Sequence, residues 1–267
     1  MEIKTSVLTQ NLSKMRLQEL FKQDPKPLLN IYFSAGFPQI DSLPVLLKSL
    51  ETAGADMVEI GIPYSDPLSD GPTIQHSNSI ALENGISLEL IFQQLESSSS
   101  RIPKIMMGYF NSVLQFGVEE FCKRCFENDI SGVILPDLPL EIYQRKYQDI
   151  FKKYELSFIL LITPETTEER IRKIDENSTS FIYAVSSAGT TGTKKGIQGA
   201  EKYLQRIESM NLKTPVMVGF NISRPEDSKF ACKYTRGGII GSAFIKHIEN
   251  SKNLSQDSHQ FINYIKS

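Results

Sequence analysis

Short apolar runs alternate with longer amphipathic segments along the whole chain. The runs have the length of strands and are almost continuously apolar, which is typical of parallel strands covered by helices. In the segments between them, apolar residues recur with the period of a helix. The predicted strands are residues 28–34, 57–60, 104–108, 132–135, 158–162, 181–185, 216–218 and 238–240. The predicted helices include residues 43–52, 119–128, 141–154, 168–175 and 201–210.

Eight strand–helix units in a chain of 267 residues favour a closed (β/α)8 barrel, the TIM barrel of the α/β class, over an open doubly wound sheet. No linker rich in Pro, Gly or Ser interrupts the pattern, so we expect residues 1–267 to form a single domain. Ahead of the first strand, Leu12, Met15, Leu20 and Phe21 follow a helical pattern. This pattern predicts an extra N-terminal helix that caps the bottom of the barrel.

Composition argues against several classes of function. Lys and Arg number 29 and Asp and Glu number 31, so the net charge of −2 gives no electrostatic reason to expect nucleic acid or an anionic membrane as a partner. No apolar run approaches the roughly 20 residues that cross a bilayer. Residues 1–4 do not begin a secretory signal, and three cysteines are an odd, sparse set that favours reduced thiols. We therefore expect a soluble, cytoplasmic protein.

Cys122 and Cys125 have the spacing of a redox or metal motif. The segment around them is amphipathic, and residues three positions apart share one face of a helix. No second Cys or His pair lies nearby in the sequence to complete a tetrahedral metal site. The two thiols are therefore interpreted as core residues, and no metal is expected.

In barrels of this kind, function gathers where the strands run into the following loops. Glu59 lies near such an end, inside the apolar run 57–60. An ionised carboxylate there costs several kcal/mol unless it has a partner, so we expect a raised pKa and a protonated side chain near neutrality. Strand alternation also permits the opposite interpretation, in which Glu59 faces the helices or solvent.

The next loop, residues 65–72, adds Asp66 and Asp70 among turn-forming residues. Capping of a helix that starts near Pro72 is the common role for such aspartates. A pair of carboxylates in different environments can instead divide the roles of acid and base. Glu59 and Asp70 are therefore a candidate catalytic pair.

Residues 219–223 after the seventh predicted strand and residues 241–242 after the eighth both contain Gly and lead into helical segments. Exposed N–H groups at helix N-termini bind phosphate without Lys or Arg, which suits a chain without a basic patch. Either loop alone is an ordinary turn; together they predict a phosphate site. Residues 186–196 form a long, small and polar loop, which is typical of a mobile lid and equally of a surface loop without function.

The positions of lysine and histidine narrow the reaction. Lys104 begins its predicted strand and Lys246 falls in the last helical segments, so no Lys stands at the C-terminal end of a strand. His76, His247 and His259 are scattered over predicted helices. A Schiff-base aldolase and a metal-dependent reaction are therefore disfavoured.

Taken together, these loops resemble the alpha subunit of tryptophan synthase from about residue 28 to residue 246. The resemblance is strongest in residues 59–75 and extends to residues 108–111 and 189–192. It implies a lyase that reversibly cleaves indole-3-glycerol phosphate into indole and glyceraldehyde 3-phosphate by a retro-aldol reaction, in the last steps of tryptophan biosynthesis. Glu59 and Asp70 match the two catalytic carboxylates of that family.

Further roles are implied by the resemblance alone. It places Tyr109 and Tyr183 at the indole pocket and Thr191 in a lid over Asp70. It implies substrate or phosphate contacts for Gly192, Phe220, Asn221, Gly241 and Ser242. It also implies a PLP-dependent beta subunit as partner, in a heterotetramer of two alpha and two beta subunits, with the loop of Asp66 facing it. PLP would belong to that partner, and this chain would need no cofactor.

Three positions depart from the family pattern. Phe37 stands where many relatives have Asp, Ser187 where some have Arg, and Asn221 where Gly is usual. Asn tolerates the left-handed backbone that Gly often supplies. Two alternatives stand beside the lyase: another phosphate-binding barrel enzyme, such as an isomerase or aldolase, and a non-catalytic barrel subunit that activates its partner.

Overall fold

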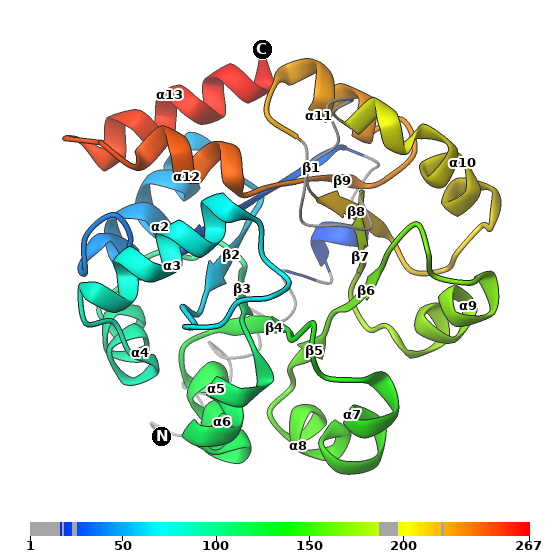
Figure 1. Cartoon of the computed structure of the whole chain (residues 1–267), viewed down its shortest axis with the longest axis horizontal. Coiled ribbons are helices and arrows are strands. Elements are labelled where there is room, and N and C mark those ends of the chain that lie inside the picture. The colour runs from blue at the N-terminus through cyan, green and yellow to red at the C-terminus, as the bar shows by residue number, and fades with distance from the viewer. Residues whose placement is uncertain (1–16, 18, 23–25, 187–196, 220–221) are drawn as a thin grey trace, which may run out of the picture.

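The structure is a computed structural model, which describes residues 17, 19–22, 26–186, 197–219 and 222–267. Its sheet is wound into a barrel with the helices outside (Figure 1). All strand pairs in the described part of the chain are parallel, in the order β5-β4-β3-β2-β1-β9-β8-β7-β6. The strands are β1 (Leu28–Ser34), β2 (Met57–Gly61), β3 (Lys104–Met107), β4 (Ile130–Ile134), β5 (Ser157–Phe158), β6 (Leu160–Ile162), β7 (Ile182–Val185), β8 (Val216–Gly219) and β9 (Gly237–Ile240).

The barrel closes through β5 and β6, which stand at the two ends of this order. Only Ile159 separates them along the chain, and its backbone N–H donates to the carbonyl oxygen of Val133 on β4 at 2.9 Å. The two strands are therefore halves of the single strand predicted over residues 158–162. The predicted (β/α)8 barrel is confirmed.

Helices surround the sheet (Figure 1). They are α2 (Ser42–Ala53), α3 (Pro72–Glu83), α4 (Leu88–Glu96), α5 (Phe110–Phe116), α6 (Val118–Glu127), α7 (Leu140–Lys146), α8 (Gln148–Lys153), α9 (Glu168–Asn177), the 3-10 turn η1 (Ile197–Ala200), α10 (Glu201–Ser209), α11 (Pro225–Ala231), α12 (Ser242–Ile248) and α13 (Leu254–Lys266). The prediction of one helix over residues 141–154 is wrong, because the backbone leaves helical geometry at Tyr147 (φ −125°, ψ −16°). The ring of Tyr147 packs on Phe110 of α5 at a centroid distance of 5.1 Å, a contact that the helical period does not reveal.

Alternation along the strands produces two apolar clusters. Leu29, Ile31 and Phe33 of β1 belong to the layer between sheet and helices, whereas Leu28 belongs to the smaller cluster inside the barrel. The inner cluster also contains Leu17, against which Leu20 and Phe21 pack, and the Phe21 ring lies 5.4 Å from that of Phe181. These contacts confirm a cap at the barrel bottom, whereas Leu12 and Met15 of the predicted helix lie outside the described residues.

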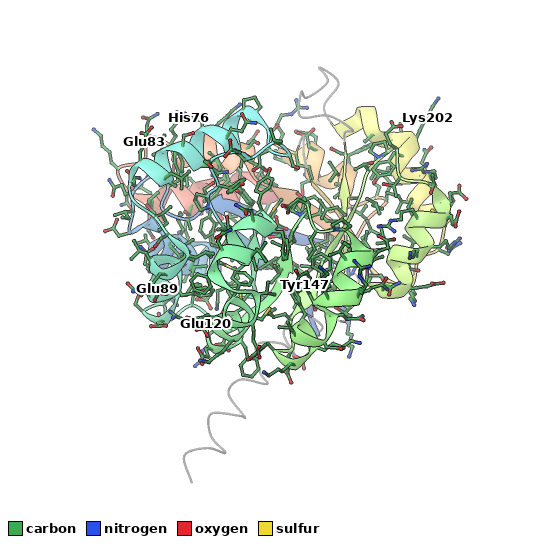
Figure 2. All side chains as sticks on the ribbon, turned by 60° about the horizontal axis from the view of Figure 1, so that its bottom comes forward. His76, Glu83, Glu89, Glu120, Tyr147 and Lys202 are labelled. Atoms are coloured by element: carbon green, nitrogen blue, oxygen red, sulfur yellow. The ribbon has the colours of Figure 1, made fainter. Side chains whose placement is uncertain are left out.

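Several expectations about single elements are met. Cys122 and Cys125 are buried on α6 and belong to the core cluster between the sheet and the helices, as interpreted from the sequence. Lys104 begins β3, and the three histidines lie on α3, α12 and α13. Charged side chains such as Glu83, Glu89 and Glu120 extend from the outer helices (Figure 2). Among the described residues, no helix is both long and apolar enough to span a bilayer.

Candidate active site

Glu59 lies on β2 and points into the barrel. Val58 and Ile60 pack in the layer beneath the helices, while Met57 belongs to the inner cluster, so alternation places Glu59 inside. The residue is 0% exposed, which excludes contact with solvent, and this alternation excludes an orientation toward the helices.

One hydrogen bond holds the Glu59 carboxyl group. Nδ2 of Asn30, on the neighbouring β1, donates to Oε1 at 2.6 Å. The other oxygen, Oε2, has no partner among the described residues. Burial raises the pKa of Glu59 to about 8, although the Asn30 hydrogen bond acts in the opposite direction. The carboxyl group is therefore protonated near neutrality, as the sequence led us to expect.

Asp70 lies in the loop between β2 and α3 and is 8% exposed. Its backbone N–H donates to the carbonyl oxygen of Pro67 at 3.0 Å, which makes the loop compact. The N-cap of α3 is Gly71 and no side chain caps that helix, so capping explains neither Asp66 nor Asp70. Burial raises the pKa of Asp70 to about 6, and a hydrogen bond from Tyr109 moderates the rise.

Tyr109 follows β3 and supports the loop that contains Asp70. Its hydroxyl accepts a hydrogen bond from the backbone N–H of Ser69 at 2.8 Å. Its ring stacks on Tyr64 with centroids 5.1 Å apart and an interplanar angle of 24°. The aromatic pair therefore connects the ends of β2 and β3 and fixes Asp70 at the mouth of the barrel.

A cleft opens at this end of the barrel and contains about 360 Å³ of space, including the part open to solvent. It is lined by Tyr32, Asp70, Ile74, Met107, Tyr183, Ile239, Gly241 and Ser242. Four of the predicted site residues, Asp70, Tyr183, Gly241 and Ser242, therefore meet at one cleft. Glu59 and Tyr109 are not part of its lining, but Glu59 is paired with Tyr32 in the β1–β2 register.

Sequence reasoning missed Tyr32, Ile74, Met107 and Ile239. The alternation of side chains along a strand could have identified three of them, because Tyr32, Met107 and Ile239 lie on the inward face of their strands, as Glu59 does. Glycines that pack closely against the aromatic rings of the cleft also mark this region. A Cβ on Gly61 would lie 2.2 Å from the Tyr32 hydroxyl oxygen, and one on Gly219 would lie 2.2 Å from that of Tyr183.

The two loops predicted to bind phosphate differ in the structure. Ser242 begins α12 directly after Gly241 at the cleft, and the first N–H groups of a helix have no acceptor within it. In contrast, Asp227 of α11 accepts from the N–H of Ser223 at 3.1 Å and from that of Arg224 at 3.2 Å. The N–H groups just ahead of α11 are thus occupied by a carboxylate of that helix, whereas no side chain caps α12.

The remaining predicted positions fall outside the cleft or outside the described residues. The latter group comprises Ser187, Thr191, Gly192, Phe220 and Asn221. Phe37 is buried in the core at 1% exposure. Asp66 is exposed and accepts from the Ser65 hydroxyl at 2.6 Å, two residues before Leu68, which is 86% exposed.

Comparison with known proteins is consistent across sequence and structure. A model of the family described as tryptophan synthase alpha chain matches residues 18–266. The tryptophan synthase alpha chain of Flavobacterium johnsoniae is 51% identical over 232 residues, which cover 86% of this chain and 92% of that protein. That of Christiangramia forsetii is 46% identical over 255 residues, which cover 94% and 98%.

Solved structures give the same result. The crystal structure of tryptophan synthase subunit alpha from Legionella pneumophila has a TM-score of 0.82 and 30% identity, covering 95% of this chain and 97% of that one. A structure of Mycobacterium tuberculosis tryptophan synthase has a TM-score of 0.83 and 26% identity, covering 95% and 98%.

Proposed function

Because the chain belongs to the tryptophan synthase alpha chain family, a family of lyase-type enzymes, we propose that Glu59 and Asp70 cleave indole-3-glycerol phosphate in its barrel cleft. The products are indole and glyceraldehyde 3-phosphate, and the reaction is reversible. One observation supports this assignment above all: two buried carboxyl groups with different environments both lie close enough to Tyr32 and Tyr183 to interact with them electrostatically.

Glu59 supplies the proton that starts the cleavage. Its carboxyl group is protonated near neutrality and can protonate C3 of the indole ring. The ring then becomes an iminium ion that accepts the electron pair of the breaking bond between C3 and the glycerol chain. The resulting Glu59 carboxylate takes the proton of the glycerol hydroxyl as the aldehyde forms, which restores the acid.

Asp70 stabilises the charge that develops on the ring. At neutral pH it is mostly ionised, because its pKa of about 6 lies below that of Glu59. Its carboxylate accepts the indole N–H and so stabilises the positive charge on the iminium. The hydrogen bond from Tyr109 holds Asp70 in its ionised form for this role.

The cleft divides into apolar and polar regions that suit the two ends of the substrate. Tyr32, Met107, Tyr183 and Ile239 offer the apolar surface for the indole ring. Gly241 and Ser242 offer the start of α12 for the phosphate. Glu59 is fully buried and does not line the cleft, but it is the register partner of Tyr32, which does, so the reacting carbon must reach it beside the ring of Tyr32.

The remaining predictions belong to this proposal. Gly192, Phe220 and Asn221 are assigned to the phosphate and Thr191 to the lid by their match to the family. We further propose that the whole chain acts as one domain and that its partner is a beta subunit carrying PLP. The exposed loop of Asp66 and Leu68 faces that partner. A soluble cytoplasmic enzyme without a cofactor of its own is expected.

The assignment is tested with Glu59→Gln and Asp70→Asn. Both variants keep the size of the side chain, but the first removes the transferable proton and the second removes the negative charge. We expect each variant to lose nearly all cleavage of indole-3-glycerol phosphate, about 10²-fold or more for a general acid or a charge-stabilising group. Both should still bind a glycerol phosphate analogue, measured by calorimetry. Full activity in either variant would refute the role of that residue and favour the alternatives, a different barrel enzyme or a non-catalytic activating subunit.

A further inference from the structure

The most unusual contact inside the barrel is the one between Asn30 and Glu59. Both side chains are 0% exposed, and they lie on the adjacent strands β1 and β2. They are not direct register partners: Asn30 is opposite Met57, and Glu59 is opposite Tyr32, two residues further along β1. An amide buried inside an otherwise apolar barrel needs a specific reason, since burying it without a partner costs free energy. The hydrogen-bond partner of this amide is the carboxyl oxygen Oε1 of Glu59.

The geometry distinguishes the two oxygens of Glu59. Oε1 accepts a hydrogen bond from the Asn30 amide at 2.6 Å, which is short for an N–H···O hydrogen bond. Oε2 is buried without a partner among the described residues, as is Oδ1 of Asn30. The pair is therefore joined by one hydrogen bond, and a single carboxyl oxygen is left free.

We propose that Asn30 is a positioning residue for proton transfer, whose amide anchors Oε1 of Glu59 so that Oε2 exchanges the proton with the substrate. This inference rests on the proposed function of Glu59. Asn30 is assigned no contact with the substrate; it acts through its hydrogen bond to Glu59. It acts on the short-lived carboxylate that exists between the two proton transfers, because an amide N–H stabilises the anion more than the neutral acid.

The other titratable groups around Glu59 do not share this role. The phenols of Tyr32 from β1 and Tyr183 from β7 interact with it electrostatically. Burial raises the pKa of both phenols well above the usual range, so both stay neutral wherever the enzyme works. Among the described residues, Asn30 is therefore the one whose hydrogen bond to Glu59 favours its carboxylate form.

The test is Asn30→Leu, which keeps the volume but removes the donor. We expect kcat for cleavage of indole-3-glycerol phosphate to fall about 10-fold or more at neutral pH, while KM changes less than about 2-fold. The basic limb of the pH–rate profile should move upward by about one to two pH units, which is the effect of losing a hydrogen bond to a charged group. A purely structural role would lower the amount of folded enzyme and leave this limb where it is.

Asn78→Leu is the matched control. Asn78 is 2% exposed and accepts a hydrogen bond from the Ser34 hydroxyl at 3.0 Å, so this variant also removes a buried amide but leaves Glu59 alone. Its basic limb should coincide with that of the wild type. If Asn30→Leu does not fold, Asn30→Val serves instead, because it also removes the donor without adding a charge beside Glu59.

The outcomes separate this inference from the proposed function. If Glu59→Gln is inactive and neither Asn30 variant shifts the limb, the positioning role is wrong and the function stands. If Glu59→Gln keeps full activity, the assignment of Glu59 fails, and the inference about Asn30 fails with it. A limb shift confined to the Asn30 variants supports both.

Discussion

Glu59 and Asp70 are both buried carboxyl groups, but their surroundings differ in degree. Glu59 is fully enclosed and has a single amide donor, which leaves its pKa at about 8. Asp70 retains slight exposure and is hydrogen-bonded by Tyr109, which leaves its pKa at about 6. Near neutrality the first is mostly acid and the second mostly anion, which is the division that the proposed reaction requires.

The pH dependence of kcat/KM should follow from these two values. Activity needs Asp70 ionised, so it should fall as the pH drops below about 6; it needs Glu59 protonated, so it should fall as the pH rises above about 8. Steady-state cleavage assays on the isolated chain between pH 5 and about 9.5 measure both limbs. A profile that rises continuously through pH 8 would contradict the role of Glu59 as an acid.

Residues of the site were predictable from sequence to different extents. Glu59 and Asp70 stand out because a carboxylate in an apolar strand and another in a turn are unusual local patterns. Asn30 and Tyr32 do not stand out, because their importance depends on the β1–β2 register, which places them beside Glu59. The register between two strands depends on the whole barrel and cannot be predicted from the sequence of either strand alone.

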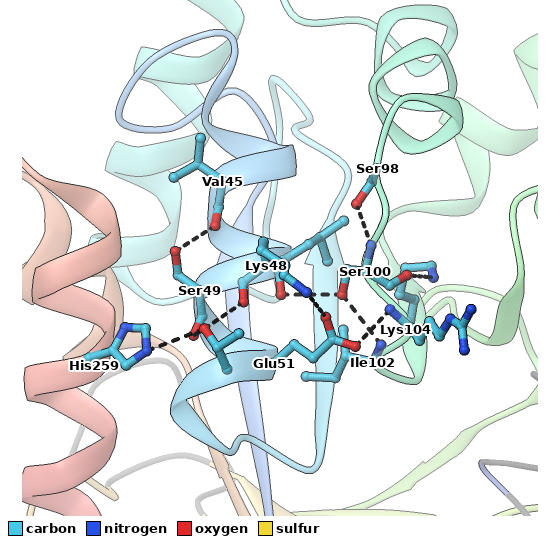
Figure 3. A network of polar contacts seen from close by, with 12 residues as sticks. Val45, Lys48, Ser49, Glu51, Ser98, Ser100, Ile102, Lys104 and His259 are labelled. Carbon is cyan, nitrogen blue, oxygen red and sulfur yellow. Dashed lines mark hydrogen bonds and ion pairs between the residues drawn. The ribbon is translucent and has the colours of Figure 1, made fainter.

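At the scale of elements, polar contacts fix helices to the strand entrances. Glu51 near the end of α2 accepts from the backbone N–H of Arg101, just before β3, at 2.9 Å and from Lys48 Nζ at 3.2 Å. Figure 3 shows this network at the α2–β3 junction, where Ser100 also donates to the carbonyl oxygen of Leu47 at 3.3 Å. Burial opposes ionisation of Glu51, but the Arg101 N–H and Lys48 outweigh it and lower its pKa.

Glu51→Ala should therefore reduce the free energy of unfolding by about 1 kcal/mol at pH 7, a value reduced for partial solvent screening. Because the folded pKa lies below the ordinary value of 4.5, this contribution is present above pH 4.5 and is lost as the pH falls through the folded pKa. Urea unfolding at pH 7 and near the acid limit of stability measures the difference. Exposed Glu83→Ala is the control; a Glu51 deficit that stays constant in acid would contradict the linkage.

The apolar pattern predicted where most elements lie, but tertiary contacts changed some of their boundaries. The strand predicted over residues 158–162 is divided at Ile159, where the chain closes the barrel by bonding back to β4. This difference arises from a hydrogen bond to a residue that a periodic pattern does not identify.

At the scale of the whole molecule, the two ends of the barrel have different chemistry. The bottom is closed by Leu17 and Phe21 packed on the inner apolar cluster, whereas the top contains the cleft, both carboxyl groups and the loop of residues 65–72. Leu68 in that loop is 86% exposed, the most exposed of the large apolar side chains in the described part of the chain. An apolar side chain so placed beside the site suits contact with a partner.

The loop also provides a physical connection between a partner and the chemistry. Leu68 donates its N–H to the carbonyl oxygen of Asp66 at 2.9 Å, and Asp70 follows two residues later, bonded to Pro67. A beta subunit that contacts Leu68 would therefore restrict the same short turn that fixes Asp70. Ordering of a catalytic residue by a partner raises activity only in the complex.

Leu68→Ser tests this connection. We expect cleavage by the isolated chain to stay within about 2-fold of the wild type. Activation by the beta subunit of the same organism should fall, because the variant loses an apolar contact that contributes about 1–3 kcal/mol for a buried Leu. Titration of the beta subunit against cleavage rate gives both the affinity and the maximal activation. Val45→Ser, a 45% exposed apolar residue on α2, is the control and should titrate like the wild type. Equal activation of the Leu68 variant would mean that the partner does not reach this turn.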